Sequence, residues 1–429
     1  DFHLLEEQLK SARANKLRLA LIWFGAFKNA TGTYAPSWVR KDSTRFPRAQ
    51  NSADSNSAIK NSQANPVLSV FSEALCQADT RAFEALMSYL SEHDPNHTVV
   101  MVQVENEVGL LGAARDHSPE AEAAWLEHGS DWPTEEAFMA WGFASYCERL
   151  AKAGKRIKAL PMFVNAWLGP QPGQTKPGDW PSGGPSTNVL EVWKATAPSI
   201  DILCPDIYVP ESHSFMAIYH REDNPLFIPE SRHKAADVVW ALGEHHALGY
   251  SVFGAEDGRV GNKLSELYGV LREADSVISA AQRDGRIWAV LPSQGAEKSS
   301  RIIGDTTVTA VDAFAALERF VEHAGVDLNL RRPEPASELE NLPVAIDSAT
   351  EFGPFGLVIQ ESPNEFLLIG QGVNLVFESA RQTVEIDYVQ EGKFTSNTWV
   401  KGRTLNGDER LNQVPLFEIG CARIRVLTL

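Results

Sequence analysis

The stretch VVMVQVENEVG, residues 99–109, joins a buried strand to a polar end, and the interpretation of the whole chain starts from it. Residues 99–102 are apolar and mostly β-branched, which predicts a strand. Glu105, Asn106 and Glu107 follow without an intervening turn residue. If the strand continues undisturbed, pleating places Glu105 and Glu107 on one face and Asn106 on the other, whereas a bulge would change this.

Apolar runs like this one recur along the first 260 residues, with helical patterns between them. They are RLALIWF (18–24), VVMVQVE (99–105), LPMFVNAW (160–167), IDILCPDIY (200–208), LFIPE (226–230) and YSVFGAE (250–256). Strands alternating with helices predict a parallel sheet, either in a barrel or doubly wound. No GxGxxG follows a strand, which weakens the dinucleotide-binding alternative. Polar or aromatic residues end nearly every run, and because barrel enzymes collect their chemistry at carboxyl strand ends, the pattern favours a (β/α) barrel.

Two loops that follow strands are unusually long. Residues 46–66 are rich in Ser, Asn and Ala, and residues 169–187 are dense in Gly and Pro. Long loops in compact domains are commonly functional or disordered. Because both follow strands, we expect them on the active face of the barrel.

The character of the sequence changes after about residue 330. Residues 331–343 are predicted to form a linker, and short β-type runs separated by Gly, Asn and Pro fill residues 344–429. We therefore expect a barrel domain over 1–330 and an all-β sandwich over 344–429.

Composition restricts the classes of partner. The 429 residues carry a net charge of −17, so nucleic acid and anionic membranes are disfavoured, and neutral small molecules or polysaccharides are favoured. The four cysteines are scattered without a CxxC pair, and neither a transmembrane run nor a signal peptide is evident. The chain begins with Asp1, so a processed, trimmed or fragmentary chain stays open, and the compartment cannot be read from it.

Two glutamates at strand ends suggest a glycosidase. Such an enzyme needs one carboxyl as proton donor and a second as nucleophile or base across the sugar ring. Glu107 follows one strand, and Glu230 ends the apolar run FIPE. Asn106, beside Glu107, is suited to hold the sugar 2-hydroxyl. The alternative for a strand-end glutamate is a solvated surface group or half of an ion pair, and for Glu105 this alternative is the better interpretation. Glu230 could form such an ion pair with Arg232 or His233.

Several of these motifs resemble the retaining β-galactosidases of glycoside hydrolase family 35, in a bacterial subgroup with an appended C-terminal β-domain. The motifs are VQVENEVG, WFGAFKN…YAPSWV (23–39), VNAWL (164–168), FIPESR (227–232), GLVIQ…EFLLIG and RTLNGDE (403–409). In that family the acid/base Glu follows Asn at the end of strand four, and the nucleophilic Glu ends strand seven. The resemblance therefore implies that Glu107 is the acid/base and Glu230 the nucleophile.

In this chain, however, Glu107 follows the second apolar run and Glu230 ends the fifth. The family has the corresponding residues at strands four and seven, so each strand number here is lower by two. We therefore expect a (β/α)8 TIM-type barrel that lacks its first two βα units, followed by the sandwich domain.

The other candidate site residues are assigned from their places at strand ends and in loops. Tyr208 is expected to hydrogen-bond Glu230, as a tyrosine does in related barrels. The expected sugar contacts are Asn106, Asn165 and Trp167 at strand ends, Trp23, Asn29, Tyr34 and Trp38 around the −1 subsite, and Trp180 stacking on the aglycone side. No metal or other cofactor is expected, because no ligand set with metal spacing is present.

The predicted activity is that of a retaining, exo-acting glycoside hydrolase that removes terminal β-galactosyl residues from plant-type oligo- or polysaccharides. A β-glucosidase, an arabinosidase and a non-catalytic carbohydrate-binding remnant stay open. A lyase or aldolase is disfavoured because no strand ends in Lys; Lys28 lies only in the loop after the first run. The resemblance also implies an extracytoplasmic location, periplasmic or secreted, and homo-oligomerisation stays open.

Overall fold

The computed structural model describes residues 2–28, 34–52, 55–58, 67–255, 263–325, 331–333 and 353–429. The chain forms two compact units. The first comprises Asp1–Ile207 and Ile218–Pro229, and the second comprises Tyr208–Ala217 and Glu230–Leu429.

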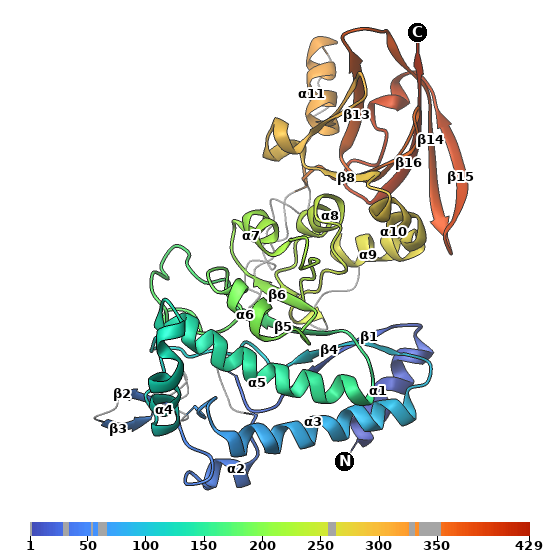
Figure 1. Ribbon diagram of the computed structural model, residues 1–429. Coiled ribbons are helices and arrows are strands. Elements are labelled where there is room, and N and C mark those ends of the chain that lie inside the picture. The colour runs from blue at the N-terminus through green and yellow to red at the C-terminus, as the bar shows by residue number, and fades with distance from the viewer. Residues whose placement is uncertain are drawn as a thin grey trace. The chain divides into compact units, whose positions relative to one another are not determined.

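The first unit is built on a curled parallel sheet of half-barrel type (Figure 1). Its strands are β1 (Leu19–Trp23), β4 (Val99–Val104), β5 (Met162–Ala166) and β6 (Ile202–Ile207), hydrogen-bonded in the order β1-β4-β5-β6. These are the first four apolar runs of the sequence, in chain order, so the predicted parallel α/β class is confirmed. The register pairs Trp23 with Val104, which brings the segments that follow β1 and β4 together at one sheet edge.

Helices α3 (Glu73–His93) and α5 (Glu135–Ile157) cover one face of this sheet and lie side by side (Figure 1). Both begin at a capping side chain, because Ser72 accepts from Leu75 N–H and Thr134 accepts from Ala137 N–H. The other helices of the chain up to residue 219 are α1 (His3–Ala14), α2 (Ser37–Lys41), α4 (Pro119–His128), η1 (Gly129–Asp131), α6 (Leu190–Thr196) and α7 (Ser212–Tyr219).

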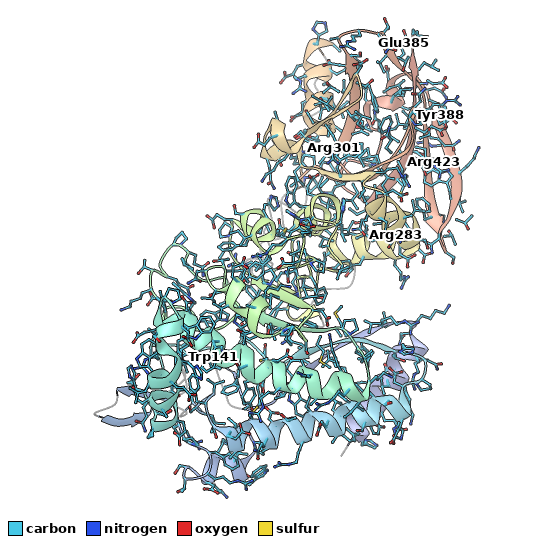
Figure 2. All side chains as sticks on the ribbon, viewed as in Figure 1. Trp141, Arg283, Arg301, Glu385, Tyr388 and Arg423 are labelled. Carbon is cyan, nitrogen blue, oxygen red and sulfur yellow. The ribbon has the colours of Figure 1, made fainter. Side chains whose placement is uncertain are left out.

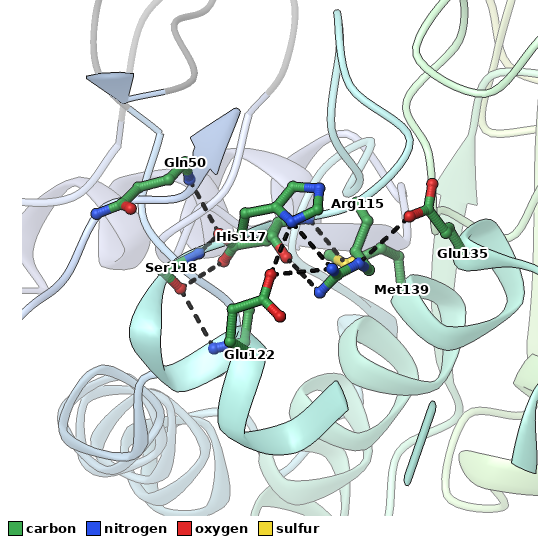
Figure 3. Close-up of polar contacts among 9 residues, drawn as sticks. Gln50, Arg115, His117, Ser118, Glu122, Glu135 and Met139 are labelled. Atoms are coloured by element: carbon green, nitrogen blue, oxygen red, sulfur yellow. Dashed lines mark hydrogen bonds and ion pairs between the residues drawn. The ribbon is translucent and has the colours of Figure 1, made fainter. Parts of the chain in front are cut away.

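A polar cluster organises the connection between β4 and α5 (Figure 3). Ser118 caps α4, and the Asp116 carboxylate accepts from the Ser118 and Gln50 backbone N–H groups at 2.7 and 2.9 Å. The Arg115 guanidinium donates to Glu122 at 2.9 Å. The cluster thereby ties the start of α4 to the short hairpin of β2 (Gln50–Ser52) and β3 (Ser55–Ala58). Part of the predicted 46–66 loop lies outside the described residues.

The second unit contains two antiparallel sheets. One has the order β15-β14-β16-β12-β11-β8 and the other the order β13-β10-β9. Their strands are β8 (Ile287–Val290), β9 (Ser300–Ile303), β10 (Thr306–Asp312), β11 (Phe355–Ser362), β12 (Glu365–Gln371), β13 (Val373–Ser379), β14 (Val384–Thr395), β15 (Thr398–Leu405) and β16 (Gly420–Thr428). Apolar residues of both sheets form one shared core, so the predicted sandwich architecture is present.

Side chains also link strands of the larger sheet that have one strand between them (Figure 2). Arg423 of β16 pairs with Glu361 of β11 at 2.7 Å and lies over the Trp399 ring at 4.8 Å. Tyr388 of β14 donates to Glu365 of β12 at 3.0 Å. These contacts join strands that are far apart in the sequence.

The sandwich begins earlier than the sequence predicts. β8 pairs with β11 and β10 pairs with β13, so residues 287–312 belong to the C-terminal sheets rather than to a barrel ending at 330. The reason is packing, because Trp288 and Val308 are buried in the same core as Val358. Most of the predicted 331–343 linker lies outside the described residues.

The sixth apolar run differs from its prediction as well. Residues 250–255 form no regular strand, although Phe253 N–H donates to the carbonyl of Ser231 at 3.0 Å; Glu256 lies outside the described residues. Ser231 belongs to the short β7 (Glu230–Ser231).

The helices of the second unit from residue 235 on are α8 (Ala235–Glu244), α9 (Lys263–Glu273), α10 (Asp275–Arg283), η3 (Pro292–Gln294), η4 (Ala296–Lys298), α11 (Ala313–His323) and η6 (Gly407–Leu411). Among the described residues, no helix combines the length and apolarity needed to cross a membrane.

Candidate functional site

The end of β4 departs from a regular strand. Glu105 and Glu107 have φ angles of 63° and 48°, in the left-handed region that non-glycine residues seldom adopt. The pleat therefore stops at Val104, and the alternation that would place both glutamates on one face does not apply. Each carboxyl has its own environment instead, which separates the two residues that look equivalent in the sequence.

Glu107 is buried, with only 4% of its surface exposed, and it has two strong partners. The Trp167 indole N–H donates to Glu107 Oε1 at 2.5 Å, and the Lys28 ammonium forms an ion pair with Oε2. The Glu107 backbone N–H donates to Asn165 Oδ1 at 3.0 Å. Donors at both oxygens therefore fix the orientation of this buried carboxyl at the end of β4.

The contact of Lys28 with Glu107 was missed by the sequence analysis, which placed this lysine only in a loop. The available signal was its position shortly after the strand that pairs with β4.

A network of buried amides joins three strand ends. Gln103 donates to Asn165 Oδ1 at 2.9 Å, and Asn165 donates to Asp206 Oδ2 at 2.9 Å and to Asn106 Oδ1 at 3.2 Å. All four side chains are less than 8% exposed. The network fixes the Asn106 side chain through its amide oxygen. Sequence reasoning assigned no role to Gln103 or Asp206.

In the second unit, the Tyr208 hydroxyl donates to Glu230 Oε1 at 2.6 Å, so the predicted contact between these two residues is present. Glu230 is half-buried at the start of the two-residue strand β7. The neighbouring His233 has its imidazole at the carbonyl of Phe253, at 3.0 Å. The tyrosine therefore orients the carboxyl to which the family resemblance gives the role of nucleophile.

The aromatic candidates after β1 gather elsewhere in the first unit. The Trp23 indole donates to Asp79 on α3 at 2.9 Å and packs edge-on against Phe83. Together with Tyr34 and Trp38, Trp23 lines an apolar hollow of about 230 Å³ between this segment and α3. Trp23 therefore faces the helix layer, not the network around Glu107. Asn29 lies outside the described residues.

Trp180 was predicted to stack on a sugar, but it is only 1% exposed. Its indole N–H donates to Glu136 on α5 at 2.6 Å. A ring enclosed in this way presents no face to a ligand, so Trp180 packs the 169–187 loop onto the unit rather than lining a subsite.

Glu105 lies in the interior, with 0% exposure, and accepts from the backbone N–H groups of Ala26 and Phe27 at 3.0 Å each. Burial and the neighbouring Asp79 carboxyl raise the pKa of Glu105 well above its ordinary value. The expectation that Glu105 is a solvated group or half of an ion pair is therefore wrong, because the carboxyl is enclosed and its acidic neighbour is Asp79.

Comparisons with known proteins cover different parts of the chain. Residues 264–415 match a family described as a domain of unknown function, DUF5597. This match includes β8 to β15 and lies within the second unit. A search of curated proteins found no match.

Among solved structures, the chain is similar to the catalytic domain of a β-amylase from Paenibacillus polymyxa, with 8% identity, a TM-score of 0.39 and coverage of 59% of this chain and 80% of that one. It is also similar to a Paenibacillus polymyxa xyloglucanase from glycoside hydrolase family 44, with 12% identity, a TM-score of 0.33 and coverage of 81% and 70%. A third is the PgaB (BpsB) glycoside hydrolase domain from Bordetella bronchiseptica, with 14% identity, a TM-score of 0.29 and coverage of 49% and 64%. With TM-scores below 0.5, these similarities do not by themselves assign an activity to the chain.

Proposed function

We propose that the protein is a retaining glycoside hydrolase in which Glu107 is the acid/base and Glu230 the nucleophile. The observation that carries the proposal is the buried Glu107 at the end of β4, held by Trp167 beside an Asn106 that the amide network fixes in place. The Tyr208–Glu230 hydrogen bond supports the second role, because a donor to one oxygen orients the carboxylate.

The proposed reaction has two displacements. Glu230 attacks the anomeric carbon while Glu107 gives its proton to the leaving oxygen, so the glycosidic C–O bond breaks as the glycosyl–enzyme bond forms. Glu107 then takes a proton from water, whose oxygen attacks the same carbon and releases Glu230. Two inversions leave the sugar with its original β configuration. Asn106 holds the 2-hydroxyl, where a hydrogen bond that strengthens in the transition state accelerates both steps.

The substrate we propose is a terminal β-galactosyl residue of a plant-type oligo- or polysaccharide. Support for galactose comes from the family 35 resemblance of VQVENEVG and FIPESR. The acidic chain also favours a neutral sugar over an anionic polymer.

The first experiment is to assay the full chain with nitrophenyl β-galactoside, β-glucoside and arabinoside, alongside Glu230→Gln and Glu107→Gln. We expect galactoside hydrolysis with the β-anomer released first, and a loss of kcat of about 10³-fold or more in Glu230→Gln. Glu127→Gln on α4 is the matched control, because that side chain is 76% exposed. Equal, weak activity in the parent and both site variants would instead identify a non-catalytic carbohydrate-binding protein.

Adding azide to the assay distinguishes the acid/base role of Glu107 from the nucleophile role of Glu230. Azide needs no general base to attack a glycosyl enzyme, so it should restore turnover of the nitrophenyl sugar by Glu107→Gln and yield the β-glycosyl azide. The same additive should not restore Glu230→Gln by that route. A crystal structure with a bound sugar should show the two carboxyls about 5–5.5 Å apart, whereas roughly 8 Å would indicate inversion.

A further inference from the structure

A second pair of acidic side chains lies in the interior of the first unit, outside the proposed chemistry. Asp79 from α3 and Glu105 from the end of β4 are 8% and 0% exposed, and their carboxyls hydrogen-bond to each other. The Trp23 indole and the Tyr146 hydroxyl donate to Asp79 at 2.9 and 2.8 Å. The pair thus joins β1, α3, β4 and α5.

Two carboxyls in contact need a proton between them. Both cannot be ionised in a site of low polarity, because desolvation and mutual repulsion disfavour the second charge. Burial first, and then Asp79, raise the pKa of Glu105. Within the described residues, no Lys, Arg or His forms an ion pair with either carboxyl. The dianion therefore has no counter-ion there.

The other titratable groups around the pair stay neutral and cannot replace the proton. They are Cys76 on α3 and Tyr146 and Cys147 on α5, and burial raises the pKa of each, to about 11 for Cys76. The charge state of the region is therefore set by Asp79 and Glu105 themselves.

The backbone after β1 is fitted closely around the pair. A Cβ added at Gly25 would lie 2.2 Å from Glu105 Oε1 and 2.6 Å from Asp79 Oδ2, closer than real contacts allow. The next two residues, Ala26 and Phe27, donate their N–H groups to Glu105. The path of this segment is therefore dictated by the carboxyl pair.

The residue that follows is Lys28, which forms the ion pair with Glu107. Three consecutive residues are thus bound at the end of β4. Glu105 accepts from the backbone N–H groups of Ala26 and Phe27, and Glu107 forms the ion pair with Lys28. We propose that the Asp79–Glu105 pair, joined by one shared proton, is a positioning device that sets Lys28 against Glu107 and so fixes the geometry of the acid/base. The catalytic part of this inference rests on the proposed function, whereas the placement of Lys28 does not.

The proposal predicts a specific pH dependence. A group whose pKa is raised on folding contributes stability that is fully present below its unfolded pKa, about 4.3 for Glu, and that is lost as pH rises through the folded pKa. When the shared proton leaves, the two carboxylates repel each other. The hydrogen bonds that position residues 26–28 then weaken. Glu105→Gln has no such proton to lose and keeps an N–H donor for Asp79, but its carbonyl can accept from only one of the two backbone N–H groups that Glu105 binds.

The test compares the parent chain with Glu105→Gln and Glu105→Ala by labelling lysines with an acetylating reagent and quantifying them by mass spectrometry. Lys28, 15% exposed in its side chain, is compared with the exposed Lys41 as internal reference. We expect Lys28 to be protected at neutral pH in the parent chain and less protected in Glu105→Gln, which loses one backbone acceptor. Relative labelling should rise by about tenfold or more in Glu105→Ala, which loses both acceptors. At alkaline pH, protection should fall in the parent chain but persist in Glu105→Gln.

Two further readouts keep the outcomes distinct. Infrared spectra of the parent chain at neutral pH should contain the C=O band of a protonated carboxyl that is absent from Glu105→Gln. In the galactoside assay, Glu105→Gln should extend the alkaline limb of kcat/KM while leaving KM at the optimum unchanged. Equal Lys28 labelling in all three proteins, or no protonated-carboxyl band in the parent chain, would overturn the inference. Absence of hydrolysis with intact Lys28 protection would overturn only the proposed function.

Discussion

At the scale of single residues, burial decides what an aromatic or acidic side chain does. Trp180 occurs in a loop rich in Gly and Pro, which in sequence favours an exposed stacking platform. In the structure its indole N–H instead satisfies Glu136, a carboxyl that also accepts from Ser186 and Asn188. Burial raises the pKa of Glu136, so each donor to this carboxyl matters for stability.

We therefore expect Trp180→Phe to lower the free energy of unfolding by about 1–3 kcal/mol, because it leaves a buried acceptor without one partner. Chemical denaturation measures this change. Trp38→Phe is the matched control, since Trp38 is 53% exposed and its replacement should change stability by about 0.5 kcal/mol or less. A Trp180→Phe protein of unchanged stability and weakened sugar binding would favour the original stacking assignment instead.

At the scale of secondary-structure elements, Asp94 anchors the start of β4. Its carboxylate accepts from the backbone N–H groups of Thr98 and Val99 at 3.0 and 2.8 Å, and Arg13 of α1 donates to it at 2.8 Å. Burial acts to raise the pKa of Asp94, but these hydrogen bonds outweigh it and hold the pKa well below the ordinary value. The anion is therefore the form that holds α1 and β4 together.

Asp94→Asn should cost about 1–3 kcal/mol at neutral pH, because an amide presents N–H groups where two backbone donors need acceptors. Since the pKa is depressed on folding, this stabilisation is present above the unfolded value of about 3.9 and is lost as pH falls toward the folded value. Denaturation curves measured across acidic pH should therefore show that the difference in free energy of unfolding between the parent chain and Asp94→Asn becomes smaller as pH falls. Glu92→Gln, at a neighbouring exposed position, should show no such difference.

In the second unit, helix α8 packs closely against strand β8. Gly243 of α8 lies against β8, where an added Cβ would be 2.4 Å from the Ala289 backbone N, whereas nothing lies within 4 Å of a Cβ added at Gly269 in α9. We expect Gly243→Ala to destabilise by about 1–3 kcal/mol through overpacking. Gly269→Ala should stabilise by roughly 0.5–1 kcal/mol through helix propensity alone. Thermal unfolding of the two variants checks the contrast, and equal shifts would mean that α8 does not pack closely on β8.

At the scale of the whole molecule, the position of the boundary between barrel-type and β-sandwich parts has a direct consequence. β8 and β10 precede residue 330 in the chain, yet they pair with β11 and β13 beyond it. A chain ending at residue 330 would leave Trp288 and Val308 without the strands that bury them.

In such a shortened chain we expect backbone amides of β8 to lose their protection from hydrogen exchange, while those of β4 in the first unit stay protected. Exchange measured by mass spectrometry on the shortened and full chains makes the comparison. Persistent protection of residues 287–290 in the shortened chain would show that β8 does not depend on β11.

Local patterns along the chain were sufficient to predict the parallel order of strands and helices in the first unit and the β-sandwich class of the C-terminal region, because apolar periodicity and strand-end polarity are local features. The Tyr208–Glu230 contact was expected from the family resemblance instead. Only folding placed the start of the sandwich at β8, enclosed Trp180, and brought Lys28 as well as Trp167 to the carboxyl of Glu107. It also paired Glu105 with Asp79, because left-handed φ angles at Glu105 and Glu107 ended the pleat and sent two alternating carboxyls into different surroundings. Burial and pairing depend on partners distant in the sequence, and no local pattern encodes them.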